Sequence, residues 1–499
     1  MARICLSLTG RTIAEDLAVL DLYRGQIDLV ELRADFLEMG EMLNLRAFPQ
    51  RAGLPCILTV RRRVDGGDFD EGEGVRLVMM AKGLTHARSD TSANFTYVDL
   101  ESDFRVSAIE EACRIFGTRI IRSQHFLEGL PENLDAVWEE IAAEPEEIPQ
   151  LAATCRDAKE FARLATWANT LPPREKIIIG MGPYGFPSRI LAEQLGSSLV
   201  FTSAISAGLV GAGPGHLDPE VLIDTFRFRK IGPTTSVFAL GGGASCLGSR
   251  QPALHNAAFS RAGIDAIVLP VPAEDAEGLL AAITAANVIG AAITVPHKES
   301  ILPLLTTISP EARDVGAVNT LARLPEGGWS GHNTDTIGFE RSIREFLGRT
   351  DLRGLRVTLI GAGGAARAVA LVLSRLGASG LVLNRTLTKA RVLARHHDFS
   401  WAYNDERALD LVLDHSDLIV NATSVGMMGE ESGDPLDWYE FTGREAVFDI
   451  INIPDRTPFL ARAKEAGCRI CNGLGMLRHQ SAEQFRIWTG REPPSDYFE

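Results

Sequence analysis

Cysteine is scarce in this sequence, and its distribution excludes a disulfide-stapled protein. Seven cysteines occur in 499 residues. An odd, scattered set argues against a disulfide framework and favours a reducing compartment. Only Cys468 and Cys471 have a suggestive spacing, but they lie in a short apolar run without a second pair. We therefore interpret them as buried strand residues and predict no metal site.

Long hydrophobic runs and an excess of positive charge are also missing. No apolar run is long enough to span a bilayer, and residues 1–8 lack the apolar stretch and cleavage site of a signal peptide. The sequence contains 50 Lys and Arg residues and 65 Asp and Glu residues, which give a net charge of −15. This negative charge argues against a nucleic-acid or anionic-membrane partner. We expect a cytoplasmic protein with small-molecule substrates, whose anionic ligands need local arginine or lysine clusters.

Length and apolar content predict several α/β domains. The chain has 499 residues and is 45% hydrophobic. It is longer than the chain length at which one hydrophobic core divides into separate domains, so two or three domains are expected. Up to about residue 230, eight short apolar runs alternate with segments of helical period, which is typical of a (β/α)8 barrel with its chemistry at the C-terminal strand ends. The runs are 4–8, 29–33, 56–60, 97–100, 119–121, 150–154, 176–180 and 199–204.

A second series of strand and helix patterns begins after the eighth apolar run. Residues 236–240 form an expected strand, a glycine-rich loop follows, and a separate βαβ unit begins at Leu355. We predict a barrel over 1–231, a substrate-binding domain over 232–345 that 476–499 complete, and a Rossmann nucleotide-binding domain over 346–475.

A glycine motif in the last region indicates a dinucleotide site, because it follows an apolar strand and opens a helix. Gly361 permits a tight turn, Gly363 lets backbone N–H groups approach a pyrophosphate, and the small Ala365 allows close helix packing. The predicted cofactor-binding residues of this loop are Gly361, Ala362, Gly363, Gly364 and Ala365.

The end of the next strand predicts the identity of the cofactor. It reads Asn384-Arg385-Thr386, where an NAD-selective fold carries an acidic residue for the ribose 2′-hydroxyl. Arg385 and Thr386 instead offer a guanidinium and a hydroxyl to a 2′-phosphate, which favours NADP.

Three polar residues close short strands and are candidates for the reaction. Lys298, Asn319 and Asp335 could converge on one cleft. A lysine beside an aspartate at a hydride-transfer site can move the proton of a hydroxyl group. The alternative interpretation is a surface ion pair.

Residues 233–499 contain a series of family motifs. They are Pro252-Ala-Leu-His-Asn256, Thr294-Val-Pro-His-Lys298, Gly316-Ala-Val-Asn-Thr320, Asn333-Thr-Asp335, Gly361-Ala-Gly-Gly-Ala-Ala, Asn384-Arg-Thr386, Asn421-Ala-Thr-Ser-Val-Gly-Met427 and Gly475-Met-Leu with Gln480. With these motifs the region resembles the shikimate dehydrogenase family. The resemblance implies NADPH-dependent reduction of 3-dehydroshikimate to shikimate, with Lys298 as the acid/base residue and Asp335 as its partner. It implies that Ser249, Thr294, Asn319 and Gln480 bind the substrate and that Thr423, Met427 and Gly473 contact the cofactor.

Three departures from that family fall on the substrate side. Gln251 stands where the family has a second carboxylate-binding serine, Ala292 replaces an asparagine, and Asn452 replaces a tyrosine. The Gln251 amide can still donate a hydrogen bond to the substrate, but its length changes the geometry. Quinate is therefore an alternative substrate.

Residues 1–231 also contain a set of strand-end motifs. Glu31 and Arg33 share one face of a strand. The arginines Arg33, Arg61 and Arg189 form a predicted cationic patch for a carboxylate, and with Glu31 they are the expected substrate-binding residues. The motifs are Glu31-Leu-Arg33, Thr59-Val-Arg61, Asp99-Leu-Glu101, Ser123-Gln-His125, Met181-Gly and Ser188-Arg189. With them the region resembles type I 3-dehydroquinate dehydratase, which implies that Phe201 lies beneath the substrate, and fusion of the two families joins consecutive pathway steps.

The catalytic set of this second family is incomplete. The family uses a strand lysine for a Schiff base, a histidine that moves protons and a glutamate that orients it; His125 and Glu101 match, but Gln150 stands at the lysine position. An amide nitrogen has a delocalised lone pair and forms no imine. We predict an active NADP-linked shikimate dehydrogenase that carries a dehydratase-like barrel. The alternatives are a bifunctional enzyme with an altered dehydratase mechanism and a barrel that only binds a cyclic acid.

Overall fold

The computed structural model describes residues 1–87, 89–209 and 211–495. The chain divides into two compact units. The first comprises residues 1–236, 265–273 and 278–287, and the second comprises 237–264, 274–277 and the chain from 288 onward. The predicted three-domain division, with boundaries at 231, 345 and 475, stays a prediction. No helix in the described part of the chain is long and apolar enough to cross a membrane.

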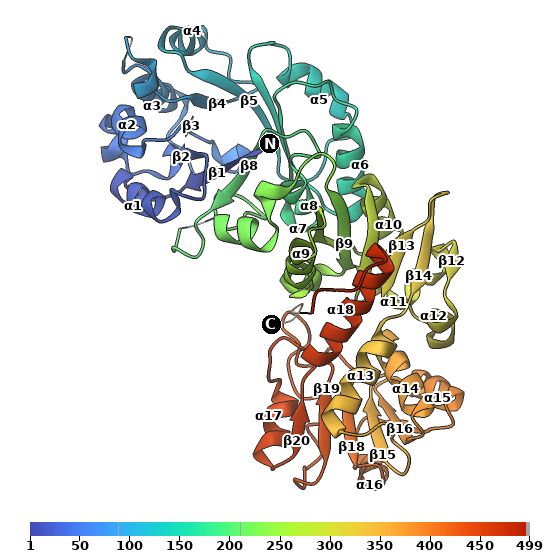
Figure 1. Cartoon of the computed structure of the whole chain (residues 1–499). Helices are drawn as coiled ribbons and strands as arrows, with labels where there is room; N and C mark the ends of the chain where they lie inside the picture. Colours follow the sequence, from blue (N-terminus) through green and yellow to red (C-terminus); the bar gives the residue numbers. More distant parts are fainter. Residues whose placement is uncertain (88, 210, 496–499) are drawn as a thin grey trace. The chain divides into compact units, whose positions relative to one another are not determined.

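The first unit contains a nearly closed parallel barrel, as the sequence predicts (Figure 1). Its strand order is β7-β6-β5-β4-β3-β2-β1-β8, and β1 pairs with both β2 and β8. The strands are β1 (Arg3–Leu8), β2 (Leu29–Arg33), β3 (Cys56–Thr59), β4 (Tyr97–Glu101), β5 (Arg119–Phe126), β6 (Ile148–Thr154), β7 (Ile177–Met181) and β8 (Leu199–Ser203). The helices are α1 (Ile13–Tyr23), α2 (Phe48–Ala52), α3 (Glu73–Leu84), α4 (Ser107–Phe116), α5 (Leu134–Ile141), α6 (Ala158–Ala168), α7 (Gly182–Gly185) and α8 (Pro187–Ile190).

The barrel interior has an apolar floor beneath a polar layer. Because side chains on a strand alternate between faces, residues two apart on β2 to β6 share the inward face. On β2 to β5 the early inward residues belong to one buried apolar cluster and the later ones are polar, so a polar layer lies toward the C-terminal ends of these strands. The later inward residues of β6 and β7, Ala152, Ile179 and Met181, belong to the apolar cluster. The apolar members include Cys5, Leu29, Ile57, Tyr97, Ile121, Ile148 and Ile177. The polar members include Glu31, Arg33, Thr59, Arg61, Asp99, Glu101, Ser123, His125 and Gln150.

A second, mixed sheet has the strand order β10-β9-β11-β13-β14-β12. β9 and β11 are parallel, while β13 is antiparallel to both β11 and β14. The strands are β9 (Ser236–Gly242), β10 (Ala266–Pro272), β11 (Val288–Ile293), β12 (Thr307–Ile308), β13 (Thr320–Arg323) and β14 (Trp329–His332). The helices of this region are α9 (Gln251–Arg261), α10 (Ala276–Ala285), α11 (His297–Ser300) and α12 (Pro310–Val315).

The third sheet is wholly parallel and has the strand order β17-β16-β15-β18-β19-β20. Its chain order starts in the middle and reverses between β15 and β18, which is the topology of a dinucleotide-binding Rossmann fold and confirms that prediction. The strands are β15 (Arg356–Ile360), β16 (Ser379–Asn384), β17 (Ser400–Tyr403), β18 (Leu418–Asn421), β19 (Ala446–Asp449) and β20 (Arg469–Cys471). The helices are α13 (Asp335–Leu347), α14 (Gly364–Arg375), α15 (Leu387–His396), α16 (Leu409–Asp414), α17 (Pro458–Glu465) and α18 (Leu474–Thr489).

Candidate functional site

A cavity of about 620 Å³ lies in the second unit at the reversal point of the parallel sheet. Strands β15, β16, β18 and β19 place their C-terminal ends along one side of it, and the segment after β11, the start of α13 and the first turns of α18 supply the other. Among the predicted site residues, its lining includes Thr294, Lys298, Asp335, Gly361, Ala362, Gly363, Gly364, Ala365, Asn384, Arg385, Thr423, Met427, Gly473 and Gln480.

Lys298 and Asp335 meet in this cavity, as their motifs predict. The Lys298 Nζ atom donates to Oδ2 of Asp335 at 2.5 Å, and Asp335 is almost fully buried. The other carboxylate oxygen accepts from the side-chain nitrogen of Asn319 at 2.8 Å. The carboxylate is therefore held from two sides, and the ammonium group points into the cavity from α11. The pair is therefore held in one place, unlike a mobile surface pair, and this geometry suits a group that moves a proton.

The side chains of Asn319 and Gln251, which we predicted to bind substrate, are bound to other protein groups. The Asn319 amide nitrogen is engaged by Asp335 and by Thr334, so in this structure it positions the carboxylate instead of facing a ligand. The Gln251 side chain is buried, and its Nε2 donates to Oε1 of Gln484 at 2.6 Å. Gln484 in turn donates to the backbone oxygen of Asn319. Sequence reasoning missed Gln484 because nothing in the pattern of α18 marks it.

The glycine loop leaves room for a pyrophosphate. Gly361 has φ of +113°, and a Cβ atom there would lie 2.9 Å from the backbone oxygen of Ala422, so only glycine fits. A Cβ on Gly363 would meet nothing within 4 Å, so open space lies over the start of α14. Backbone N–H groups at a helix start, facing an open cradle, fit a dinucleotide phosphate.

Arg385 also lines this cavity. Its guanidinium is 2.9 Å from Glu431, and both side chains are largely exposed. Asn384 donates to the backbone oxygen of Thr386. Thr386 immediately precedes α15, and unlike Asn384 and Arg385 it does not line the cavity. An arginine whose partner is an exposed carboxylate can exchange it for a 2′-phosphate at low cost.

A buried carboxyl group that the sequence did not signal supports one wall of the cavity. Asp449 at the end of β19 accepts from Asn421 at 3.0 Å and from Thr457 at 2.6 Å. Burial raises the pKa of Asp449 to about 7, although these hydrogen bonds oppose the increase. Asn421 also accepts from the hydroxyl of Thr423, so the network holds this cavity residue in place.

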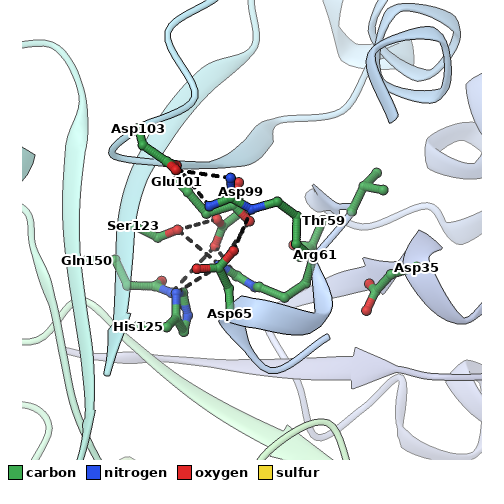
Figure 2. A network of polar contacts seen from close by, with 12 residues as sticks. Asp35, Thr59, Arg61, Asp65, Asp99, Glu101, Asp103, Ser123, His125 and Gln150 are labelled. Carbon is green, nitrogen blue, oxygen red and sulfur yellow. Dashed lines mark hydrogen bonds and ion pairs between the residues drawn. The ribbon is translucent and has the colours of Figure 1, made fainter. Parts of the chain in front are cut away.

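The barrel holds a second polar site, centred on Arg61 (Figure 2). Its guanidinium donates to Asp99 at 2.8 Å and to Ser123 at 3.1 Å, and it lies 3.6 Å from Glu101. Glu101 is also bound by the buried Arg76. The predicted contact that orients His125 through Glu101 is therefore replaced in this structure by two arginine contacts to Glu101.

Arg61 also determines what His125 can do. Its nitrogen lies 2.9 Å from Nδ1 of His125. A guanidinium only donates, so Nδ1 accepts and the proton of a neutral ring is on Nε2. Burial, Arg61 and Arg33 lower the pKa of His125 well below its ordinary value. His125 thus presents a hydrogen-bond donor to the barrel interior and has no free basic nitrogen there.

Gln150 lies beside this histidine, inside the polar layer. Its Nε2 is 3.4 Å from Nε2 of His125 and 3.4 Å from Oδ2 of Asp99. Its Oε1 is buried without a hydrogen-bond partner among the described residues. A neutral amide therefore stands where the family resemblance places the nucleophilic amine.

Of the other predicted barrel residues, Glu31 and Arg33 have charged or polar side-chain partners, whereas Arg189 bonds only to backbone oxygens. Glu31 accepts from Ser7 and Thr59, and Arg33 is paired with Asp35 at 2.7 Å. Arg189 is buried, and its two hydrogen bonds go to the backbone oxygens of Phe201 and Pro214.

The Nε atom of Arg189 has no partner within the described chain. Burial lowers the pKa of Arg189 to about 10, so it is still charged at neutral pH. An unpaired buried cation indicates an anionic ligand.

Comparisons with known proteins identify the families that the two parts of the chain match. The model of type I 3-dehydroquinase matches residues 4–233, and models of the shikimate dehydrogenase substrate-binding domain, the shikimate/quinate 5-dehydrogenase domain and the shikimate 5′-dehydrogenase C-terminal domain match 243–321, 344–428 and 473–499. A bifunctional 3-dehydroquinate dehydratase/shikimate dehydrogenase, described as chloroplastic, from Arabidopsis thaliana is 29% identical, over 94% of this chain and 79% of the relative.

Shikimate dehydrogenases (NADP⁺) resemble the second half alone. Those of Citrifermentans bemidjiense and Moorella thermoacetica are each 40% identical, over 50% and 49% of this chain and 89% and 85% of theirs. Together with the Rossmann topology and the Lys298–Asp335 pair, these matches show that the chain belongs to the shikimate dehydrogenase family, fused behind a type I 3-dehydroquinase domain.

Proposed function

We propose that the second unit reduces 3-dehydroshikimate to shikimate with NADPH. The observation that carries this proposal is the Lys298–Asp335 pair at 2.5 Å in a cavity that also contains the dinucleotide loop. Bound NADPH supplies the hydride. Lys298 donates the proton that turns the carbonyl oxygen into a hydroxyl, and Asp335 holds the ammonium in place. Thr294 and Gln480 face the same space and offer hydrogen bonds to ring hydroxyls.

Loss of NADPH absorbance on addition of 3-dehydroshikimate to the full-length protein tests this assignment. We expect turnover with NADPH and much slower turnover with NADH. The reverse reaction is run with shikimate and with quinate, because Gln251 and Asn452 depart from the family pattern. Turnover of quinate alone would replace the proposed substrate, and absence of all turnover would refute the proposal.

Arg385 should determine the preference for NADPH. Arg385→Ala should raise KM for NADPH by about 10-fold or more, since a charged hydrogen bond to the 2′-phosphate is lost. KM for NADH should change little. Arg407→Ala, which removes another exposed arginine of the same domain that is paired with Asp405, is the matched control. Equal increases for both cofactors would contradict the assignment.

We propose that the barrel binds a cyclic hydroxy acid without forming an imine. Three observations support this: Gln150 at the nucleophile position, a His125 whose Nδ1 is occupied by Arg61, and the unpaired buried Arg189. A carboxylate on Arg189 satisfies the buried charge. The His125 ring and the neighbouring Gln150 amide can bind a hydroxyl group.

Arg189 offers a test of barrel binding that is separate from catalysis. Calorimetric titration of the full chain with 3-dehydroquinate should detect a site that Arg189→Ala removes, with affinity reduced at least about 10-fold. Arg51→Ala, an exposed change on α2, should leave the site intact. An unchanged isotherm in Arg189→Ala would show that this arginine does not hold the acid.

We propose a reducing compartment, such as the cytoplasm, for the protein. None of the seven cysteines, which all lie within the described residues, forms a disulfide, and six of them are buried. The prediction that both Cys468 and Cys471 are buried strand residues holds only in part, because Cys468 is buried but precedes β20 and donates to Glu445, while Cys471 ends β20 and is partly buried. Persistence of seven free thiols in unfolded protein purified without reductant would support this placement, and recovery of disulfides would contradict it.

A further inference from the structure

A glycine stands at position 364 although neither the dinucleotide fingerprint nor the backbone requires one there. In the fingerprint Gly-x-Gly-x-x-Gly/Ala, the restricted positions are 361, 363 and 366, so position 364 can vary. Gly364 is the first residue of α14, and its φ lies outside the left-handed region that favours glycine. The reason for a glycine at this position is therefore the space around it.

The nearest neighbour of Gly364 is Lys298, the residue to which we assign the proton of the reaction. A Cβ atom at position 364 would lie 2.9 Å from Cβ of Lys298 and 3.3 Å from its Cδ, with Cβ of Ala317 at 3.4 Å. Carbon atoms in ordinary contact are about 3.5–4.0 Å apart. The Lys298 side chain therefore packs directly against the backbone of α14, where a methyl group on residue 364 would collide with it.

Gly363, one residue earlier, has different surroundings. A Cβ atom there would meet nothing within 4 Å, and its φ of −87° and ψ of −174° are open to residues with a side chain. This is the open space in which a dinucleotide phosphate fits. The two adjacent glycines therefore leave room for different groups, Gly363 for the cofactor and Gly364 for Lys298.

Lys298 is the group that would move if residue 364 gained a side chain. The start of α14 is anchored in the core of its domain, because Ala366 and Val369 are fully buried. Lys298 belongs to α11, which has only four residues. Moving it would disturb the 2.5 Å contact between its Nζ and Oδ2 of Asp335.

An ion pair links the same two helices beside this contact. An Arg367 nitrogen, three residues after Gly364 on α14, lies 3.1 Å from Oε2 of Glu299, the residue after Lys298. Both side chains are partly exposed, so the pair by itself contributes little free energy. It holds α11 against α14 at the place where the lysine packs.

We propose that Gly364 is a positioning residue for Lys298. Because residue 364 has no side chain, the lysine can lie against α14 and hold its ammonium at Asp335. The dinucleotide loop then has a second function besides phosphate binding, which is to set the position of the proton donor. This inference rests on the proposed function of the second unit as a reductase that uses NADPH.

Alanine substitution of each glycine in the full-length protein tests the proposal. Gly364→Ala should lower kcat for reduction of 3-dehydroshikimate by about 10-fold or more, because a small displacement of a reacting group costs rate. The solvent deuterium isotope effect on kcat should rise, since proton transfer then limits turnover. Kd for NADPH, measured by fluorescence titration without substrate, should change little.

Gly363→Ala should have the opposite profile. Its methyl group enters the open space over α14, so Kd for NADPH should rise by about 10-fold or more as hydrogen bonds to a charged phosphate are lost. The solvent isotope effect on kcat at saturating NADPH should stay at the wild-type value, because Lys298 is not displaced.

A second variant acts on the same contact without adding atoms. Arg367→Ala removes the ion pair to Glu299 and should lower kcat by about 3-fold, with Kd for NADPH unchanged. Arg375→Ala, which removes an arginine of the same helix that is paired with Glu311, is the matched control and should keep the wild-type kcat. Thermal melting checks that each variant folds.

Wild-type kcat in Gly364→Ala would overturn the proposal, and so would a fall in kcat without a rise in the isotope effect. If Gly364→Ala weakens NADPH binding and keeps kcat, the residue serves the cofactor alone and the proposal is wrong. If Gly364→Ala does not fold, an unchanged kcat in Arg367→Ala decides against it. Absence of turnover in the wild-type chain would instead refute the proposed function.

Discussion

Replacing Lys298 with alanine should lower kcat for reduction of 3-dehydroshikimate by about 10³-fold, within the range for loss of a positioned general acid. KM for NADPH should stay nearly constant, because the dinucleotide loop and Arg385 are untouched. Lys298 is suited to this role because its Nζ lies 2.5 Å from a carboxylate that is only 1% exposed. The ammonium is therefore held in the cavity at one position.

Stopped-flow and steady-state assays in both directions check this prediction. Asp335→Asn should also slow turnover, by a smaller factor of about 10², since the lysine is retained but loses its anchor. Lys389→Ala changes an exposed lysine on α15 and should leave kcat and both KM values as they are. Turnover within about 10-fold of wild type in Lys298→Ala would show that another group supplies the proton.

The full-length protein should not dehydrate 3-dehydroquinate at an enzymatic rate. Mixing the two should produce no rise in the ultraviolet absorbance of a conjugated enone, while the dehydrogenase of the same sample works. The reason is chemical: Gln150 offers an amide where an imine needs an amine. His125, with Nδ1 facing Arg61, lacks a free basic nitrogen for proton abstraction.

Borohydride reduction provides the second measurement for the barrel. Wild-type protein treated with 3-dehydroquinate and borohydride should show no added mass. Gln150→Lys places an amine beside Asp99 and should give a reduced adduct of about one ligand per chain. An adduct on the wild type would locate a nucleophile elsewhere among Lys82, Lys159, Lys176 and Lys230, the lysines of residues 1–231. Enone formation without an adduct would establish an imine-free dehydratase.

The lysines available in the barrel explain why rescue is not expected. Lys82 lies on α3 and Lys159 on α6, both outside the strands that line the interior. Lys176 precedes β7, at the N-terminal end of the barrel, and donates to the backbone oxygen of Pro172. Chemistry in this fold occurs at the C-terminal strand ends.

The sequence by itself determined the two folds, because both have characteristic patterns over short stretches of sequence. Eight apolar runs at strand length predicted the barrel, and a strand, a glycine turn and a helix predicted the Rossmann sheet. Lys298 and Asp335 could be paired from sequence because each follows a strand in a recognisable motif, and such ends meet at one edge of a site.

Only the tertiary structure decided where individual side chains point. Gln251 turns to Gln484, 233 residues away along the chain, and Glu101 binds Arg76 and Arg61 rather than His125. Arg250, between two residues of a recognised motif, faces Asp455. Periodicity specifies which face of a strand or helix a residue occupies. The hydrogen-bond partner of a polar side chain is determined by its burial and by which groups of other elements lie within its length. That choice depends on residues far apart in sequence, and no local pattern contains it.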